Sequence, residues 1–294
     1  MAPAPETRLY DQYLALLERC LTGSIYAEEY TRLQFRRGSI QSLLFRPIAS
    51  LLRSKDYYLF KRLYPTQEDR ENGLYWPGQG QTMIGLSRLR NVRSCLEQVL
   101  RDNIPGDVIE TGVWRGGCCI YMKAILACHG SDKTLWVADS FQGVPKPNPG
   151  KFAVDAAEER KAAFYKFDQL AIPRSEVESN FRIYGLLDER VRFLEGWFCD
   201  TLPAAPIGKL ALMRLDGDLY ESTWDALVNL YPKLSPGGYC LIDDYGGIPA
   251  CRQAVEDYRG QNAIREPITP VDKTGVFWRR ELVTQGVGGS GVCA

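Results

Sequence analysis

The pattern of apolar residues predicts two different parts of the chain. Residues 8–35 begin with leucines at helical spacing (Leu14, Leu17 and Leu21), so we expect a helix there. Residues 36–64 mix leucine pairs with seven basic residues and a single acid, Asp56. We interpret this stretch as a helical extension that packs on the main domain or on another subunit. Binding to a membrane surface or an anionic partner is the alternative interpretation.

From residue 83 onward the pattern becomes regular. After a loop rich in glycine and proline, a helix is predicted from Met83 to Leu100, and apolar runs then alternate with helical patterns. Strands are expected at 107–113, 134–141, 190–198, 209–216, 237–244 and 275–280, and helices at 117–130, 222–234 and 249–260. Ser222 is the expected N-cap of the second of these helices. This order predicts an α/β fold with a mostly parallel, doubly wound sheet.

The predicted organisation has three segments. Residues 1–74 form an N-terminal helical extension that supplies lid or oligomer contacts, residues 75–282 form the α/β domain, and residues 283–294 form a mobile tail. The 145–180 segment is long, polar and partly helical, and we expect it to influence the choice of substrate.

Composition excludes several classes of protein. The formal net charge is zero over 294 residues, which argues against nucleic-acid binding, and no apolar run is long enough for a membrane span. The N-terminus has no apolar signal region. The nine cysteines include no CxxC pair and His129 is the only histidine, so a zinc site is not expected. We therefore expect reduced, mostly buried thiols and a cytoplasmic protein.

Polar groups follow the predicted parallel strands one after another. They are Glu110, Asp139, Glu195, the pair Asp216 and Asp218, and the pair Asp243 and Asp244. In a doubly wound sheet, the ligand crevice lies at the carboxyl ends of the strands. The sequence therefore predicts that these acids meet around a ligand.

The first three of these strand ends are typical of a nucleoside site. Glycines after Glu110 let the backbone approach a ligand, but their spacing differs from the dinucleotide motif, and a carboxylate there suits an ammonium or sulfonium group. Asp139 is placed to accept hydrogen bonds from ribose hydroxyls, and Trp197 offers an aromatic face for a purine. This set favours S-adenosylmethionine over NAD. For each residue alone there is a plainer interpretation: a helix cap or buried salt bridge for Glu110, and core packing for Trp197.

The last two strand ends carry four carboxylates that repel one another. At an effective dielectric constant of ~20, two charges ~4 Å apart cost about 4 kcal/mol, and a divalent cation removes that cost. Oxygen ligands alone select Mg²⁺, Mn²⁺ or Ca²⁺. If the strand geometry continues, Asp216 and Asp218 point to the same side, so that one binds the ion and the other faces the substrate. The alternative is that Asp216 and Asp218 form a solvated acidic turn. This would not explain why a second acidic pair, Asp243 and Asp244, follows the neighbouring strand.

Several motifs together resemble one family. ETGVWRGG, ADSFQG, EGWFxDTLP, MRLDGDLYEST and LSPGGYxxIDDY resemble, in this order, the macrocin O-methyltransferase (TylF-type) family, which includes sugar methyltransferases of mycinamicin and novobiocin biosynthesis. The resemblance runs from about Tyr75 to Trp278. It implies a class I, Rossmann-like methyltransferase that depends on S-adenosylmethionine and Mg²⁺ and methylates a hydroxyl of a natural product, often a deoxysugar.

The resemblance also implies roles for individual residues. Asp216, Asp243 and Asp244 would bind the metal, and Asp218 would be the general base. Cofactor contacts would come from Glu110, Thr111, Gly112, Trp114, Arg115, Asp139, Ser140, Gly196, Trp197 and Asp216, with Thr82 and Met83 in a lid over the methionine end. The small-molecule acceptor would give up its hydroxyl proton to Asp218 while the metal lowers the pKa of that hydroxyl. We also expect a homo-oligomer, a dimer or a tetramer.

Two other functions compete with this hypothesis. An NAD-dependent oxidoreductase or epimerase of the short-chain type requires a YxxxK pair after the fourth strand, whereas the match found here, Tyr57 to Lys61, precedes the whole sheet. The second competing function is a non-catalytic binding module on an inactive enzyme scaffold. The presence of all the proposed metal ligands and of the proposed base argues against it.

Overall fold

A seven-stranded sheet forms the centre of the protein. The computed structural model describes residues 5–32, 40–148, 150–157 and 163–282. Within them the strand order is β5-β4-β3-β6-β7-β9-β8. The bounds are β3 (Asp107–Thr111), β4 (Leu135–Asp139), β5 (Val191–Glu195), β6 (Leu210–Leu215), β7 (Leu234–Ile242), β8 (Thr269–Pro270) and β9 (Val276–Arg279).

The sheet is mostly parallel. The five neighbouring strands β5-β4-β3-β6-β7 pair in parallel. Strand β9 pairs antiparallel with β7 and with the short β8. The order of strands reverses at β3, which lies between β4 and β6. A reversal of this kind opens a crevice at the carboxyl ends of the strands. The predicted mostly parallel, doubly wound α/β fold is confirmed, and β8 is an additional strand that the sequence did not indicate.

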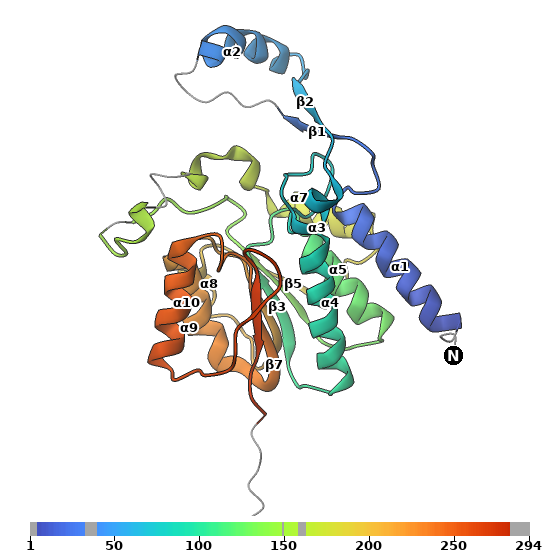
Figure 1. Ribbon diagram of the computed structural model, residues 1–294, viewed down its shortest axis with the longest axis vertical. Coiled ribbons are helices and arrows are strands. Elements are labelled where there is room, and N and C mark those ends of the chain that lie inside the picture. Colours follow the sequence, from blue (N-terminus) through green and yellow to red (C-terminus); the bar gives the residue numbers. More distant parts are fainter. Residues whose placement is uncertain (1–4, 33–39, 149, 158–162, 283–294) are drawn as a thin grey trace, which may run out of the picture.

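Helices cover both faces of the sheet (Figure 1). One face carries α1 (Pro5–Leu21), α4 (Gly85–Arg101), α5 (Gly117–Cys128) and α7 (Arg174–Ile183), and the other carries α8 (Phe198–Thr201), α9 (Tyr220–Leu230) and α10 (Pro249–Gln261). Shorter elements are α3 (Gln67–Asn72), η1 (Phe164–Lys166), η2 (Asp168–Leu170) and η3 (Tyr231–Lys233).

Burial on both faces explains why the strands appear in the sequence as continuous apolar runs. Val108 packs in the cluster under α4 and α5, while its neighbour Ile109 packs in the cluster under α9 and α10. Successive side chains of a strand point to opposite faces, so a strand that is covered on both sides has apolar residues at most of its positions.

The N-terminal region differs from its prediction. The helix expected over 8–35 ends at Leu21; Gly23 then adopts a left-handed conformation, and the chain forms β1 (Glu29–Arg32). Beyond Leu21 the segment lacks the helical repeat of apolar residues, so nothing favours a longer helix. Leu14, Leu17 and Leu21 are buried in the core on α5. The first helix therefore packs against the α/β body.

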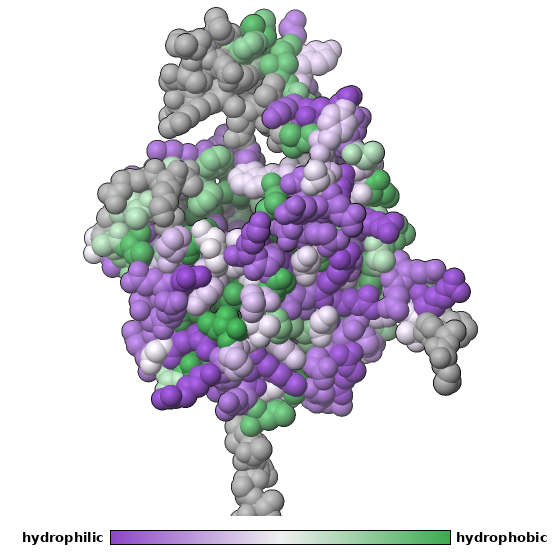
Figure 2. Space-filling model, in the orientation of Figure 1, coloured by the Kyte–Doolittle hydropathy of each residue, from purple (hydrophilic) through white to green (hydrophobic). Residues whose placement is uncertain are grey.

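The next segment projects from the body, and we call residues 29–63 the arm. It contains β1, α2 (Ile40–Arg53) and β2 (Phe60–Leu63), with β1 and β2 paired antiparallel. Figure 1 shows the arm at the top, and Figure 2 shows hydrophobic residues on it. Arg36 and Arg37 of the basic stretch, and the predicted tail 283–294, lie outside the described residues. No helix within the described part of the chain is long and apolar enough to cross a membrane.

The start of α9 also differs from its prediction. Ser222 is not the N-cap: the helix begins at Tyr220, Leu219 occupies the cap position, and Ser222 is buried within the first turn. The backbone N–H groups of Tyr220 and Glu221 donate instead to the Asp155 carboxylate, at 2.7 and 3.1 Å. A residue from the distant 145–180 segment thus satisfies the amides that a local cap usually binds.

Candidate active site

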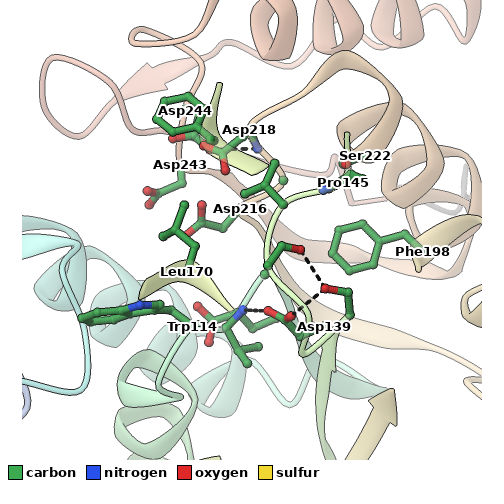
Figure 3. Close-up of a pocket in the computed structure, with 18 of the residues that line it drawn as sticks. Trp114, Asp139, Pro145, Leu170, Phe198, Asp216, Asp218, Ser222, Asp243 and Asp244 are labelled. Carbon is green, nitrogen blue, oxygen red and sulfur yellow. Dashed lines mark hydrogen bonds between the residues drawn. The ribbon is translucent and has the colours of Figure 1, made fainter. Parts of the chain in front are cut away.

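A cavity of about 590 Å³ opens at the carboxyl ends of the parallel strands. Its volume lies within the usual range of small-molecule sites. It is lined by the ends of β3, β4, β6 and β7, by the start of α9, and by residues before α4 and after β4. Figure 3 shows four carboxylates, those of Asp216, Asp218, Asp243 and Asp244, grouped on one side, with Asp139 and Trp114 on the other.

Asp139 is fixed at the end of β4 by backbone donors. The N–H of Val113 donates to Oδ2 at 2.8 Å, and the N–H of Phe141 donates to Oδ1 at 2.7 Å. Burial raises the pKa of this carboxyl, and the backbone hydrogen bonds oppose that rise. Each carboxylate oxygen can accept more than one hydrogen bond, so Asp139 keeps acceptor capacity toward the cavity.

The other predicted cofactor contacts fall into two groups. Cavity-lining residues include Thr82, Met83, Glu110, Gly112, Trp114, Ser140 and Trp197. Gly112 has φ +78°, and a Cβ on it would lie 1.8 Å from the carbonyl oxygen of Asp216, so the loop after β3 requires glycine there. Thr111, Arg115 and Gly196 are not among the cavity-lining residues in the described part of the chain.

Arg115 supports the loop that precedes the lid residues. Its Nη1 donates to the carbonyl oxygens of Pro77, Gly78 and Gly80 at 3.2, 3.0 and 2.9 Å. Its guanidinium carbon lies 4.2 Å from the centre of the Trp114 ring, which faces the cavity. Arg115 therefore lies behind the loop and holds it in place. Glu195, the acid at the end of β5, is exposed and pairs with Arg174 at 3.4 Å.

Glu110 forms a buried salt bridge, which the sequence had left open as the alternative to a cofactor contact. Its Oε1 accepts from Arg214 Nη1 at 2.6 Å, and its Oε2 accepts from Cys119 Sγ at 2.7 Å. Burial raises the pKa of Glu110, and the positive charge of Arg214 opposes the rise. Because this carboxylate already has a cationic partner, it attracts a cationic ligand less strongly than the sequence implied.

Three carboxylates converge at the ends of β6 and β7. Asp216, Asp243 and Asp244 each offer an oxygen, and these atoms lie within 4.8 Å of one another. Three oxygen donors at this spacing fit a hard divalent cation such as Mg²⁺. Asp218 lies beside them and also lines the cavity. The strand ends at Leu215 and Asp218 has φ +57°, so the two acids reach the cavity through a turn and not through continued strand geometry.

Two arginines in this cluster were not predicted. Arg214 is 2% exposed; its Nη1 lies 3.0 Å from Asp216 Oδ2, and its Nη2 donates to Asp243 Oδ1. From α4, Arg88 Nη1 lies 2.5 Å from Asp243 Oδ2. A signal for Arg214 was present, because a lone charge inside the apolar run LALMRL needs buried anions as partners. Arg88 had no such signal, since it resembles the other arginines of its helix.

The arginines neutralise only part of the negative charge. Glu110, Asp216, Asp218, Asp243, Asp244 and Asp272 make six carboxylates against two guanidinium groups, an excess of four. Burial and the charge of Asp243 raise the pKa of Asp218 to about 6 and that of Asp216 well above its usual value. Burial and Asp216 likewise raise the pKa of Asp244. A bound divalent cation would oppose these rises.

The sequence model of the macrocin O-methyltransferase (TylF) family matches residues 10–280. The chain belongs to this family. The match starts well before Tyr75, so the family resemblance includes most of α1 and the arm. Membership confirms the predicted O-methyltransferase activity and implies S-adenosylmethionine as methyl donor.

Known methyltransferases are similar to this chain over most of their length. The chain is 45% identical to demethyldecarbamoylnovobiocin O-methyltransferase of Streptomyces niveus, over 95% of this chain and 99% of the relative. It is 50% identical to mycinamicin III 3''-O-methyltransferase of Micromonospora griseorubida, over 73% and 84%. It is 48% identical to a tetracenomycin-C 4'-O-methyltransferase of Streptomyces olivaceus that acts on a dimethoxyrhamnosyl derivative, over 92% of each.

Solved structures confirm the methyltransferase fold. The O-methyltransferase NovP is 43% identical, with a TM-score of 0.76, over 92% of this chain and 99% of that one. The calicheamicin methyltransferase CalS11 is 17% identical with a TM-score of 0.52, over 95% and 94%, and shares the fold. The competing oxidoreductase hypothesis has no support; Tyr57 is exposed and belongs to the arm.

Proposed function

We propose that the protein is a divalent-metal-dependent O-methyltransferase that methylates a sugar hydroxyl of a natural product during antibiotic biosynthesis. The observation that carries this proposal is the convergence of Asp216, Asp243 and Asp244 beside a cavity of about 590 Å³. The names of the relatives support the class of acceptor, because two of them are methyltransferases of glycosylated tetracenomycin and of mycinamicin III.

S-adenosylmethionine supplies the methyl group from its sulfonium centre. We assign the cofactor to the end of the cavity around Asp139, where the carboxylate would accept hydrogen bonds from the ribose hydroxyls. Trp197 would provide an aromatic surface for the adenine, and Thr82 and Met83 would cover the methionine end; all three residues line the cavity. Ser140 supports this end through its hydroxyl, which donates to the carbonyl oxygen of Gly143 at 2.8 Å.

The acidic end would hold the metal and the acceptor. Asp216, Asp243 and Asp244 are the proposed ligands, and a divalent cation bound there would act as a Lewis acid that lowers the pKa of an alkyl hydroxyl. Asp218 is the proposed general base and would take the hydroxyl proton on its carboxylate. Burial and the charge of Asp243 raise its pKa to about 6, and a cation bound to Asp243 would lower it again.

The direct test is methyl transfer to a defined acceptor. The protein would be incubated with methyl-labelled S-adenosylmethionine, Mg²⁺ and a panel of sugar-bearing compounds that includes demethyldecarbamoylnovobiocin and mycinamicin III, together with an extract of the native host. Mass spectrometry and NMR then locate the label. We expect it on a sugar oxygen. A label on nitrogen, on carbon or on an aglycone hydroxyl would contradict the proposal.

We further propose that the protein is a homo-oligomer, a dimer or a tetramer, with the arm in the contact. Ile48 and Leu51 of α2 are 51% and 65% exposed, and Phe60 and Tyr64 near β2 are also exposed. An isolated monomer gains nothing from such a surface. We also propose that the protein works in the cytoplasm, because the eight described cysteines are free thiols, as a reducing compartment favours.

Light scattering tests the oligomer. The double variant Ile48→Lys and Leu51→Lys places charges on the apolar surface of α2 and should lower the molar mass to that of one chain, 33.2 kDa. Ser50→Lys adds a charge to the same helix without removing an apolar residue and serves as the control. A monomeric wild-type protein, or an unchanged mass in the double variant, would exclude this contact.

A further inference from the structure

Arg88 joins the acidic cluster to a separate loop. Its side chain is 13% exposed and lines the cavity. Nη1 contacts Asp243 Oδ2 at 2.5 Å, Nε donates to Asp272 Oδ2 at 2.7 Å, and Nη2 donates to Thr274 Oγ1. One guanidinium therefore binds a proposed metal ligand on one side and the β8–β9 connection on the other.

Hydrogen bonds within the β8–β9 connection hold its side of this contact. Asp272 Oδ1 accepts from the N–H groups of Thr274 and Gly275, each at 2.8 Å, so the carboxylate is already oriented by its own loop. Its side chain is 4% exposed. Asp272 can therefore keep Arg88 in place whether or not Arg88 also contacts Asp243.

Asp243 is likewise fixed without Arg88. Its Oδ1 accepts from Arg214, which is anchored in β6 and also binds Glu110 and Asp216. The second oxygen, Oδ2, is the one that Arg88 binds. Arg88 is thus not required to orient Asp243, and its positive charge lies where it repels any cation that approaches Oδ2.

We propose that Arg88 competes with a divalent metal for Asp243 and thereby limits the affinity of the acidic cluster for that metal. Its Nη1 binds Asp243 Oδ2. Metal binding has to compete for this carboxylate, while Nε and Nη2 keep their contacts with Asp272 and Thr274. The inference rests on the proposed function, because it requires that Asp216, Asp243 and Asp244 bind a metal.

Charge competition and simple orientation predict opposite results for Arg88 variants. Arg88→Met removes the charge and leaves Arg214 on Asp243, so Mg²⁺ should bind ~10-fold more tightly or better. Arg88→Lys keeps the charge, so its affinity should stay near that of the wild type. If Arg88 instead served to orient Asp243, both variants would bind Mg²⁺ more weakly.

The experiment is calorimetric titration of MgCl₂ into the metal-stripped full-length protein at fixed pH, without methyl donor or acceptor. Arg90→Met is the matched control. Arg90 lies on the same helix as Arg88, two residues further along, but it pairs with Glu71 at 2.8 Å and not with the acidic cluster. Arg88→Gln provides a second neutral variant, and thermal melting checks that each protein is folded.

The outcomes separate this inference from the proposed function. Tighter Mg²⁺ binding by Arg88→Met or Arg88→Gln, with unchanged binding by Arg90→Met, supports the role of Arg88. Equal or weaker binding by the folded neutral variants overturns it and leaves the metal site intact. If the wild type and all variants bind no Mg²⁺, the metal assignment fails and the inference fails with it, whereas methyl transfer remains a separate measurement.

Discussion

The two ends of the cavity hold their acidic side chains by different means. At the cofactor end, Asp139 is oriented by the backbone N–H groups of Val113 and Phe141, which are neutral donors from two loops. At the acidic end, Asp216 and Asp243 are oriented by arginine side chains, chiefly Arg214. Backbone donors leave the charge of a single carboxylate intact, whereas a cluster of carboxylates needs positive charge to remain close-packed.

This difference indicates which ligand each end can accept. A lone carboxylate held by amides is suited to hydroxyl donors such as those of a ribose. A cluster with four more carboxyl groups than guanidinium groups is suited to a cation, because two arginines leave most of its repulsion in place. The comparison predicts that variants at one end should leave binding at the other end unchanged.

The largest effect is expected at Asp218. Asp218→Asn removes the proposed base, so kcat should fall by ~10²-fold or more, while the affinities for S-adenosylhomocysteine and Mg²⁺ remain. Steady-state rates and calorimetry measure the three quantities. The control is Asp225→Asn, which changes a different carboxyl group that also lines the cavity and belongs to α9. A near-normal kcat in Asp218→Asn would mean that no side chain at this position accepts the proton.

A smaller effect is expected at Asp216. Asp216→Asn should raise the Mg²⁺ concentration for half-maximal rate by about tenfold, because one ligand oxygen loses its charge. Rates measured across a Mg²⁺ series test this, and if Asp216→Asn and Asp218→Asn exchanged their phenotypes, the roles of ligand and base would be reversed.

At the cofactor end of the cavity, a substitution of Asp139 should weaken cofactor binding and leave metal binding unchanged. Asp139→Asn replaces a charged acceptor by a neutral one, so S-adenosylhomocysteine should bind about tenfold more weakly. The calorimetric affinity for Mg²⁺ should equal that of the wild type. Weaker Mg²⁺ binding in this variant would show that the two ends are coupled and would contradict the comparison.

The smallest effect is expected at Asp155, which caps α9 from a distant segment. Asp155→Ala leaves the N–H groups of Tyr220 and Glu221 without their acceptor and should lower the free energy of unfolding by about 1 kcal/mol. Denaturant unfolding measures it. Tyr220→Phe is the control, since it removes only the hydroxyl that donates to Asp257 at 3.1 Å. Equal stability of Asp155→Ala and the wild type would exclude the cap.

The sheet was predictable from sequence because its signals are local. Strands β3, β4 and β6 are buried along almost their whole length, so they appear as largely apolar runs, and the acids at the strand ends mark the edge of the site. The family motifs add roles for the same residues, and these roles remain predictions until they are tested. The pairing of Arg214 with buried carboxylates could also have been predicted, because Arg214 is a charged residue inside a buried strand.

The missed features depend on tertiary contacts. Ser222 satisfies a local capping rule, but the helix begins two residues earlier, and Asp155, from 65 residues away, accepts from the N–H groups of Tyr220 and Glu221 in its first turn. Arg88 resembles Arg90 in the sequence, and only the fold places one at the acidic cluster and the other against Glu71. The helix predicted over 8–35 is too long, because the chain turns at Gly23, just after the helix ends at Leu21.

The central claim is that the acidic end of the cavity holds a divalent metal that methyl transfer requires. The most direct measurement is the initial rate of labelled methyl transfer to an accepted sugar compound after treatment with EDTA, followed by addition of Mg²⁺. We expect EDTA to abolish turnover, Mg²⁺ to restore it, and S-adenosylhomocysteine binding to persist throughout. Full activity in excess chelator would contradict the claim.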